Sequence, residues 1–310
     1  MTIPYPTKPP TEPITNLAAL PPGTYGVQTK YDGVRCKWYQ RTPYTASGKR
    51  IPNKDVENML FDVYNRHDIR LNLDGELLLF NTFTNAFAPF NAVQSAIMSK
   101  KSLDITTKQS LVYMVYDYDD GSELNSYERR YEILYHDTFR GRLSIDNRFM
   151  LAPIQAFDLP RVFTAFETHC KSILEKGDEG AIIRNMSSPY YYGRCPASLN
   201  IIFKYVEWLR RESVVVGYTQ LEENLDTSCK RKENMVPIEM LGSLQVRDAL
   251  FGEFEIGSGF TDAQRRDLWR KRDKLDMNLV TYKYKPAHIK AAPCPAIFVG
   301  FRDNRDLTTF

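Results

Sequence analysis

The segment Lys30-Tyr31-Asp32-Gly33-Val34-Arg35 contains the side chains that covalent chemistry at a lysine would need. A lysine amine attacks an electrophile only when it is neutral, so such a site must lower its pKa through cations, metal or desolvation. Arg35 supplies one nearby cation. An ordinary surface lysine in a hairpin turn explains the hexapeptide equally well, because short motifs match by chance.

Four more segments with chemically useful residues follow along the chain. They are Leu73-Asp74-Gly75-Glu76-Leu77, Val115-Tyr116-Asp117-Tyr118, Asp178-Glu179-Gly180-Ala181-Ile182-Ile183-Arg184 and Ile202-Phe203-Lys204. Together with the first segment, a Lys-x-Asp-Gly-x-Arg pattern, this series resembles the ordered motifs of the covalent nucleotidyltransferases. That superfamily contains DNA ligases, RNA ligases and messenger-RNA capping enzymes. The joint match makes an ordinary surface lysine a poor explanation.

The second half of the chain resembles the minimal viral and phage DNA ligases. The matching segments are 241–244, 257–269 and 296–302, and the resemblance covers the chain from about Thr24 onward. It implies an ATP-dependent DNA ligase that seals 3′-OH/5′-phosphate nicks in duplex DNA. The implied pathway has a lysyl-AMP intermediate and then a DNA-adenylate.

The resemblance implies roles for the nucleotide-binding residues. Lys30 attacks the α-phosphate of ATP, and Lys204 contacts that phosphate. Glu76 binds the ribose and Tyr116 stacks on adenine, while Glu179, with Glu76, holds Mg²⁺ or alternatively Mn²⁺. Taken singly, these residues have ordinary explanations: a salt bridge from Glu76 to an arginine such as Arg35, a core aromatic, and a solvated loop carboxylate.

The resemblance also implies which residues contact the nick. Asp32 and Arg35 address its termini, and Arg194 touches the 5′-phosphate, since a guanidinium fork fits phosphate geometry. Related ligases carry Ser-Arg where this chain has Thr45-Ala46, so we expect Lys49 or Arg50 to supply the missing contact.

Two further matches to the family are incomplete. The family's second lysine after Lys204 is replaced by Val206, so Lys204 acts alone or with help from Arg210 or Arg211. The closing motif matches loosely and gives Arg302 and Arg305 a weak assignment in orienting pyrophosphate.

Hydrophobic periodicity predicts the elements that position these residues. In the first half we expect strands at 26–29, 34–39, 73–80, 111–118 and 181–184, and helices at 54–64, 93–98, 126–134 and 166–174. A strand-rich pattern begins near 209–212, with further strands at 279–284 and 296–301. Thr261 and Gln264 have the spacing of a capping box at the start of one helix.

These elements indicate an α+β fold in two domains. Residues 1–210 would form a nucleotidyltransferase (adenylation) domain with antiparallel sheets and flanking helices, and residues 211–310 a small all-β OB-fold domain. The polar excursion at 220–240 lies where viral ligases insert a hairpin, and is a candidate DNA latch. The implied partner is nicked duplex DNA, bound by a monomer that closes around it.

Composition sets outer limits on function. The net charge of +3 neither requires nor excludes DNA. Five scattered cysteines form neither a zinc pattern nor a disulfide framework, and no stretch reaches membrane-spanning length, so we expect a cytoplasmic protein without a membrane partner. NAD⁺-dependent ligases carry a cysteine zinc module, so we expect ATP. The alternatives are an RNA ligase or GTP-using capping enzyme, and a nucleic-acid-binding protein that has lost catalysis.

Overall fold

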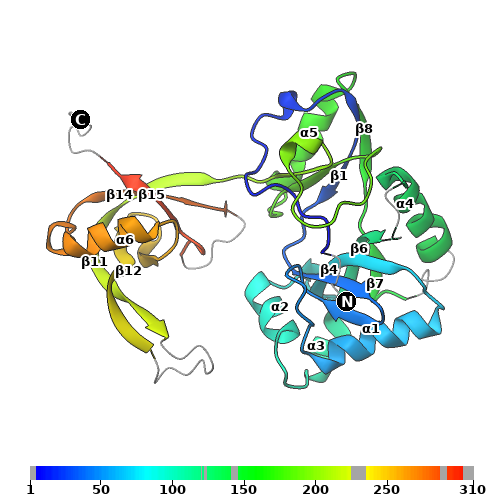
Figure 1. The fold of residues 1–310 in the computed structure, drawn as a ribbon, viewed down its shortest axis with the longest axis horizontal. Coiled ribbons are helices and arrows are strands. Elements are labelled where there is room, and N and C mark those ends of the chain that lie inside the picture. The colour runs from blue at the N-terminus through cyan, green and yellow to red at the C-terminus, as the bar shows by residue number, and fades with distance from the viewer. Residues whose placement is uncertain are drawn as a thin grey trace. The chain divides into compact units, whose positions relative to one another are not determined.

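The computed structural model describes residues 5–119, 121, 124–140, 146–224, 235–286 and 292–302. The chain divides into two compact units, Met1–Val206 and Glu207–Phe310 (Figure 1). Strand β11, Leu209–Asn224, begins just after this division. The expected boundary between residues 210 and 211 therefore falls inside the first strand of the second unit.

Two sheets make up the first unit. One has the order β10-β9-β1-β8, and the other has the order β3-β2-β4-β6-β7 with β5 paired to β4. The strands are β1 Gly23–Thr29, β2 Val34–Tyr39, β3 Thr42–Tyr44, β4 Asn72–Asn81, β5 Ala86–Phe87, β6 Leu111–Asp119, β7 Phe149–Leu151, β8 Gln155–Leu159, β9 Ala181–Asn185 and β10 Ile202–Tyr205. All pairings are antiparallel except β6 with β7. This arrangement confirms the predicted class of antiparallel sheets with flanking helices.

Short helices flank these sheets. They are α1 Lys54–Arg66, α2 Phe90–Ile97, α3 Ile105–Ser110, α4 Tyr127–Ile133 and α5 Phe163–Glu175, and a π-helical segment, Leu134–Arg140, continues α4. Helix α1 shows how local sequence specifies such an element. Asn53 caps it by accepting hydrogen bonds from two backbone amides of the first turn, and Val56, Leu60 and Val63 are fully buried along one face.

The second unit is a five-stranded antiparallel sheet of order β13-β12-β11-β14-β15 with helix α6 against β12. The remaining elements are β12 Met235–Asp248, β13 Gly252–Ile256, α6 Asp262–Arg270, β14 Leu279–Tyr284 and β15 Ile297–Phe301. The capping box is present, because Thr261 and Gln264 each accept a backbone hydrogen bond from the other. Register shifts between β11 and β12 and between β14 and β15 allow the sheet to curl around one apolar core.

A long hairpin projects from this second unit (Figure 1). Strands β11 and β12 remain paired from Val214 and Arg247 out to Asn224 and Met235. The sequence predicts that residues 220–240 form a polar excursion between strands. In its described parts, 220–224 and 235–240, this excursion is itself strand, because cross-strand hydrogen bonds satisfy the backbone without a buried core.

Asp248, at the end of β12, ties together three strands of the second unit. Its carboxylate accepts hydrogen bonds from the Leu250 amide (2.8 Å), the Ser213 hydroxyl (2.8 Å) and the Tyr282 hydroxyl (2.9 Å). Arg211 adds a charged contact. Burial alone would raise the pKa of Asp248, but these donors lower it from 3.8 to about 2.

We therefore expect Asp248→Asn to lower the free energy of unfolding at neutral pH by about 1–3 kcal/mol, because buried donors lose their acceptor. The folded-state pKa lies below the ordinary value, so this stabilisation is complete above about pH 4 and is lost as pH falls toward 2. Chemical denaturation across pH 2–7 would measure both effects. Asp276→Asn, at an exposed position, is the matched control; equal pH profiles for the two variants would contradict the assignment.

Candidate active site

The turn that joins β1 to β2 carries Lys30 and is held on both sides. The Lys30 amide donates a hydrogen bond to the Gly180 carbonyl (2.7 Å), which links the turn to the loop before β9. On the other side, a Cβ atom at Gly33 would lie 2.4 Å from the Leu77 carbonyl oxygen on β4. Only glycine permits this close approach, so the turn is fixed between the two sheets.

Lys30 forms an ion pair with Glu179, a carboxylate that is almost fully buried. The two residues are far apart in sequence and meet because β9 lies beside β1. The pair holds the lysine amine beside a group that can accept its proton. Both residues were predicted from motifs, and the structure brings them into direct contact.

One pocket collects four of the predicted residues, Lys30, Arg35, Glu76 and Tyr116. Residues for which the sequence predicts no role also line it: Ile182, Arg184 and Ile202 belong to the quoted motif segments, whereas Pro9, Gln28 and Ala152 lie outside them. A signal for Gln28 was available, because it precedes Lys30 by two positions and successive side chains on a strand alternate in direction. Pro9 and Ala152 had no comparable signal, since only tertiary structure brings them here.

Glu76 lies in this pocket with its pKa raised to about 7. Burial is the main cause, and the negative charge of Glu179 adds to it, while the positive charges of Arg35 and Lys30 act in the opposite direction. The Tyr116 hydroxyl donates to the Glu76 carboxylate at 3.3 Å. Two carboxylates and one amine thus share a partly dehydrated space.

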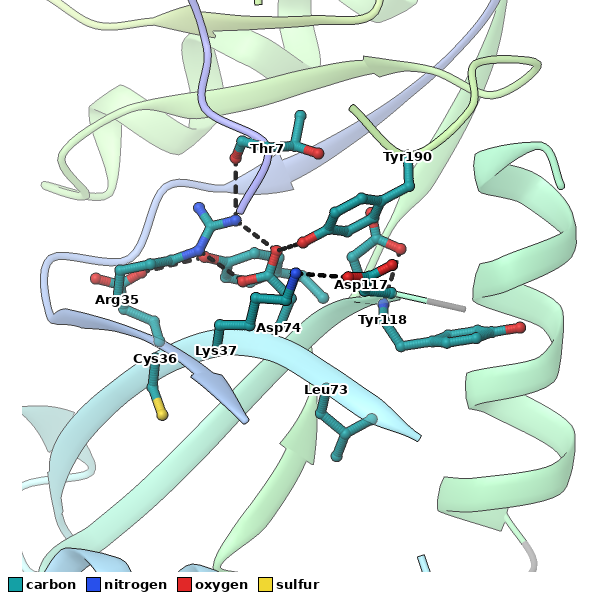
Figure 2. Close-up of polar contacts among 12 residues, drawn as sticks. Thr7, Arg35, Cys36, Lys37, Leu73, Asp74, Asp117, Tyr118 and Tyr190 are labelled. Atoms are coloured by element: carbon teal, nitrogen blue, oxygen red, sulfur yellow. Dashed lines mark hydrogen bonds and ion pairs between the residues drawn. The ribbon is translucent and has the colours of Figure 1, made fainter. Parts of the chain in front are cut away.

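The guanidinium of Arg35 is held by a network that Figure 2 shows. It forms a two-point ion pair with Asp74, whose carboxylate is fully buried, at 2.8 and 2.7 Å. It also donates to the Thr7 carbonyl (3.0 Å), and the Tyr190 hydroxyl donates to Asp74 (2.8 Å). The alternative interpretation from the sequence, a salt bridge between Arg35 and Glu76, is therefore wrong. Arg35 and Glu76 are register partners on β2 and β4, but the guanidinium of Arg35 pairs with Asp74.

A second buried carboxylate continues the network. Asp117, next to Tyr116, accepts ion pairs from Arg130 (2.8 Å) and Arg184 (2.6 Å). Burial would raise the pKa of Asp117, but the two guanidinium groups hold it below its ordinary value. Tyr116 is thereby flanked by arginines: the Cζ atom of Arg35 lies 4.7 Å from its ring centroid and that of Arg184 lies 5.6 Å away.

The donor set suits a hard divalent cation that completes its shell with phosphate. Mg²⁺ in phosphoryl-transfer sites typically takes one or two carboxylates, and its remaining ligands are water and substrate phosphates. Glu76 and Glu179 are two such carboxylates, close enough that the negative charge of Glu179 helps to raise the pKa of Glu76. Within the described residues, no group of three or more acidic, histidine or cysteine side chains gathers as a metal cage. The residues present fit a phosphate-shared ion.

Lys204, Arg210 and Arg211 are the other residues predicted to act at the nucleotide site. Lys204 lies on β10, where its register partner is Ile182 of β9. It follows Ile202 by two positions, so both side chains lie on the same face of the strand, and Ile202 lines the pocket. Arg210 and Arg211, considered as helpers, both lie on β11 in the second unit. Arg211 is engaged there by Asp248.

The predicted nick-contacting residues lie outside the pocket lining, apart from Arg35. Asp32 is half-buried in the turn after Lys30. Lys49 and Arg50 are exposed in the turn after β3, where Arg50 pairs with Glu57. Arg194 is exposed and donates to the Pro9 carbonyl (3.0 Å).

The two weakly assigned arginines belong to the second unit. Arg302 forms an ion pair with Glu212 at 2.8 Å. Arg305 lies outside the described residues. Across the described part of the chain, no helix is both long and apolar enough to cross a membrane.

Solved structures with a similar fold are DNA ligases. A Chlorella virus DNA ligase-adenylate is 23% identical over 97% of this chain and 99% of its own, with a TM-score of 0.54. A structure from work on Lig E DNA ligases is 20% identical over 90% of this chain and 92% of its own, with a TM-score of 0.62. The ligase domain of M. tuberculosis LigD is 15% identical over 96% and 95%, with a TM-score of 0.50. Comparison with curated proteins gives no significant match.

Two protein families match the sequence itself. The family described as "DNA ligase OB-like domain" matches residues 234–302, in the second unit. The family described as "ATP dependent DNA ligase domain" matches residues 9–199, well over half of the chain and nearly all of the unit that holds Lys30 and its pocket. The chain therefore belongs to the ATP-dependent DNA ligase family.

Proposed function

We propose that this ligase seals 3′-OH/5′-phosphate nicks in duplex DNA through a covalent lysyl-AMP enzyme and a DNA-adenylate. The main support is one pocket that gathers an amine, a carboxylate and a guanidinium around an aromatic ring. These groups belong to Lys30, Glu76, Arg35 and Tyr116, and a second carboxylate, that of Glu179, pairs with Lys30. A pocket with that set of groups suits the binding of a nucleotide and attack on its phosphate.

In the first step, Lys30 Nζ attacks the α-phosphorus of ATP. A phosphorus–nitrogen bond forms, the bond to the bridging oxygen breaks, and pyrophosphate leaves with the electron pair. The ion pair between Lys30 and Glu179 must open, and the lysine must lose a proton, before attack. Glu179 is the neighbouring acceptor for that proton, and Lys204 stabilises charge on the α-phosphate.

Adenine and ribose are placed by the inner wall of the pocket. Tyr116 presents a flat ring on which the base can stack. Glu76 accepts hydrogen bonds from the ribose. Its pKa of about 7 keeps a substantial fraction ionised at neutral pH.

Glu179 and Glu76 would hold Mg²⁺, or Mn²⁺, once the phosphates arrive. The ion supplies positive charge for the leaving pyrophosphate and the developing charge on the α-phosphate. The protein residues alone set the position of the lysine relative to the pocket.

The next two steps occur at the nick. A 5′-phosphate oxygen attacks the phosphorus of lysyl-AMP and releases Lys30; the adjacent 3′-hydroxyl then attacks the 5′-phosphorus and expels AMP. Asp32 and Arg35 address the termini, and Arg194 binds the 5′-phosphate. Lys49 or Arg50, both exposed, contacts the strand next to the nick. Arg302 and Arg305 act earlier, in the first step, where they assist the departure of pyrophosphate.

We further propose that a monomer closes around DNA with the β11–β12 hairpin acting as a latch. DNA contacts should be mostly to phosphates, because a ligase must accept any sequence at a nick, and affinity should fall steeply with salt. One site must serve ATP first and DNA later, and this sequence of substrates calls for movement between the two units. We place the reaction in the cytoplasm, where ATP is available and cysteines stay reduced.

The rival activities differ in nucleotide and acceptor. A capping enzyme would form an adduct with GTP, and an RNA ligase would prefer RNA ends. A non-catalytic DNA-binding protein would form no adduct. Retention of Lys30, Glu76, Glu179 and Lys204 favours a working ligase, because a binding protein needs none of these groups.

Lys30→Ala should abolish attachment of AMP while leaving nick binding nearly unchanged, because it removes the nucleophile and little of the DNA surface. The protein would be incubated with Mg²⁺ and α-labelled ATP or GTP, then chased with nicked duplex on denaturing gels. Lys30→Arg keeps the charge and should also form no adduct. An adduct in either variant, or labelling by GTP alone, would contradict the proposal.

Tyr116→Leu should raise the KM for ATP in adduct formation about tenfold or more, because stacking on a base contributes about 1–3 kcal/mol. Tyr116→Phe keeps the ring, loses only the hydroxyl contact to Glu76, and should stay near the wild-type value. Initial rates of labelling against ATP concentration would separate them. Equal KM values for the two variants would remove Tyr116 from the adenine site.

The latch proposal predicts that a shortened hairpin binds nicks poorly but still adenylates itself. Leu221 and Ile238 are register partners, so an Asn-Gly turn can join them without disturbing the rest of the sheet. We expect nick affinity to fall about tenfold or more through lost phosphate contacts, measured by gel shift at several salt concentrations. Unchanged affinity at every salt concentration would exclude a latch.

A further inference from the structure

The segment Thr7–Pro9 lies beside the active site: Pro9 lines the pocket, and the Thr7 carbonyl accepts a hydrogen bond from Arg35. The Lys8 amide donates to the Gly193 carbonyl (2.8 Å), and the Cys195 amide donates to the Lys8 carbonyl (2.9 Å). Thr7 is buried, and its hydroxyl exchanges hydrogen bonds with the Tyr191 backbone. The sequence predicts no role for this segment, because its proline-rich residues show no hydrophobic periodicity.

These bonds place the Lys8 side chain beside a residue already proposed to bind phosphate. Lys8 and Arg194 are partners in a parallel β-bridge, and side chains of such partners lie on the same face. Arg194 also donates to the carbonyl of Pro9, which lines the pocket. The two cations therefore stand together at the rim of the nucleotide site.

Arg35 pairs with Asp74, whereas neither Lys8 nor Arg194 has a carboxylate within ion-pair distance among the described residues. Lys8 Nζ instead lies over the Tyr5 ring, 5.4 Å from its centroid. Burial lowers the pKa of Lys8, and the charges of Arg194 and Arg35 lower it further.

Positive charges placed this close together repel each other until an anion joins them. The anion must fit between a compact ammonium and a planar guanidinium, and phosphate oxygens serve both. It must also lie next to Pro9 and Arg35, at the edge of the pocket. The reacting phosphates of the proposed reaction meet these conditions.

We propose that Lys8 binds a substrate phosphate together with Arg194, as a phosphate-contacting residue carried by the N-terminal segment. This inference rests on the proposed nick-sealing function. The phosphate is either the 5′-phosphate of the nick or the triphosphate of ATP, and both have the same chemistry. Backbone hydrogen bonds hold the segment in place, so the side chain can be changed without releasing it.

Lys8→Met keeps the length of the side chain and removes its charge, and Lys8→Arg restores the charge. Each would be tested in the full chain for the KM for ATP in adduct formation, and for affinity of the adenylated enzyme for nicks with a 5′-phosphate or a 5′-hydroxyl. Lys171→Met is the matched control, because that lysine lies on α5 and pairs with Glu167. Adduct formation also reports that each variant is folded.

If the nick phosphate is the ligand, Lys8→Met should lose about tenfold affinity for the 5′-phosphate nick, little for the 5′-hydroxyl nick, and Lys8→Arg should recover most of it. If the triphosphate is the ligand, the KM for ATP should rise about as much and nick affinity should stay constant. Equal losses for both nicks, or a variant indistinguishable from Lys171→Met in every measurement, would overturn the proposal. Failure of wild-type protein to form an adduct would instead reject the proposed function.

Discussion

The ion pair between Arg35 and Asp74 is the interaction on which the site depends. Both hydrogen bonds of the fork are made, and Asp74 is fully buried, so loss of either partner would leave an uncompensated charge in the protein interior. The pair joins β2 to β4, and through Tyr190 and the Thr7 carbonyl it ties in two more segments. Four distant parts of the chain thus fix one guanidinium at the wall of the pocket.

Around this pair the protein separates fixed charges from adjustable ones. Asp117 with Arg130 and Arg184 forms a buried cluster of paired charges, which holds the inner wall in place. Lys30 is partly exposed in its ion pair with Glu179, so an incoming substrate can reach it. Such a division suits the proposed reaction, in which the site accepts a nucleotide, holds it covalently and then transfers it, because the frame remains while the reacting groups change partners.

The second unit is also held together by a buried carboxylate. Its sheet is anchored by Asp248, whose acceptor oxygens gather donors from two other strands and the following turn. That anchoring lets β11 and β12 continue well beyond the core as a paired hairpin. The hairpin extends without a core of its own, and its described part exposes apolar side chains such as Met235 and Val236 as well as polar ones.

The sequence alone determined which residues carry chemistry and most local elements. Lys30, Glu76, Tyr116 and Glu179 were found by motif, and helices such as α1 and α6 by periodicity and capping, because these signals lie within a few neighbouring residues. Only the tertiary structure decided that Arg35 pairs with Asp74 and not with Glu76, and that Pro9 lines the pocket. Cross-strand choice of partner depends on side-chain direction and burial, and the N-terminal segment reaches Arg194 by backbone hydrogen bonds that leave no pattern in the residues.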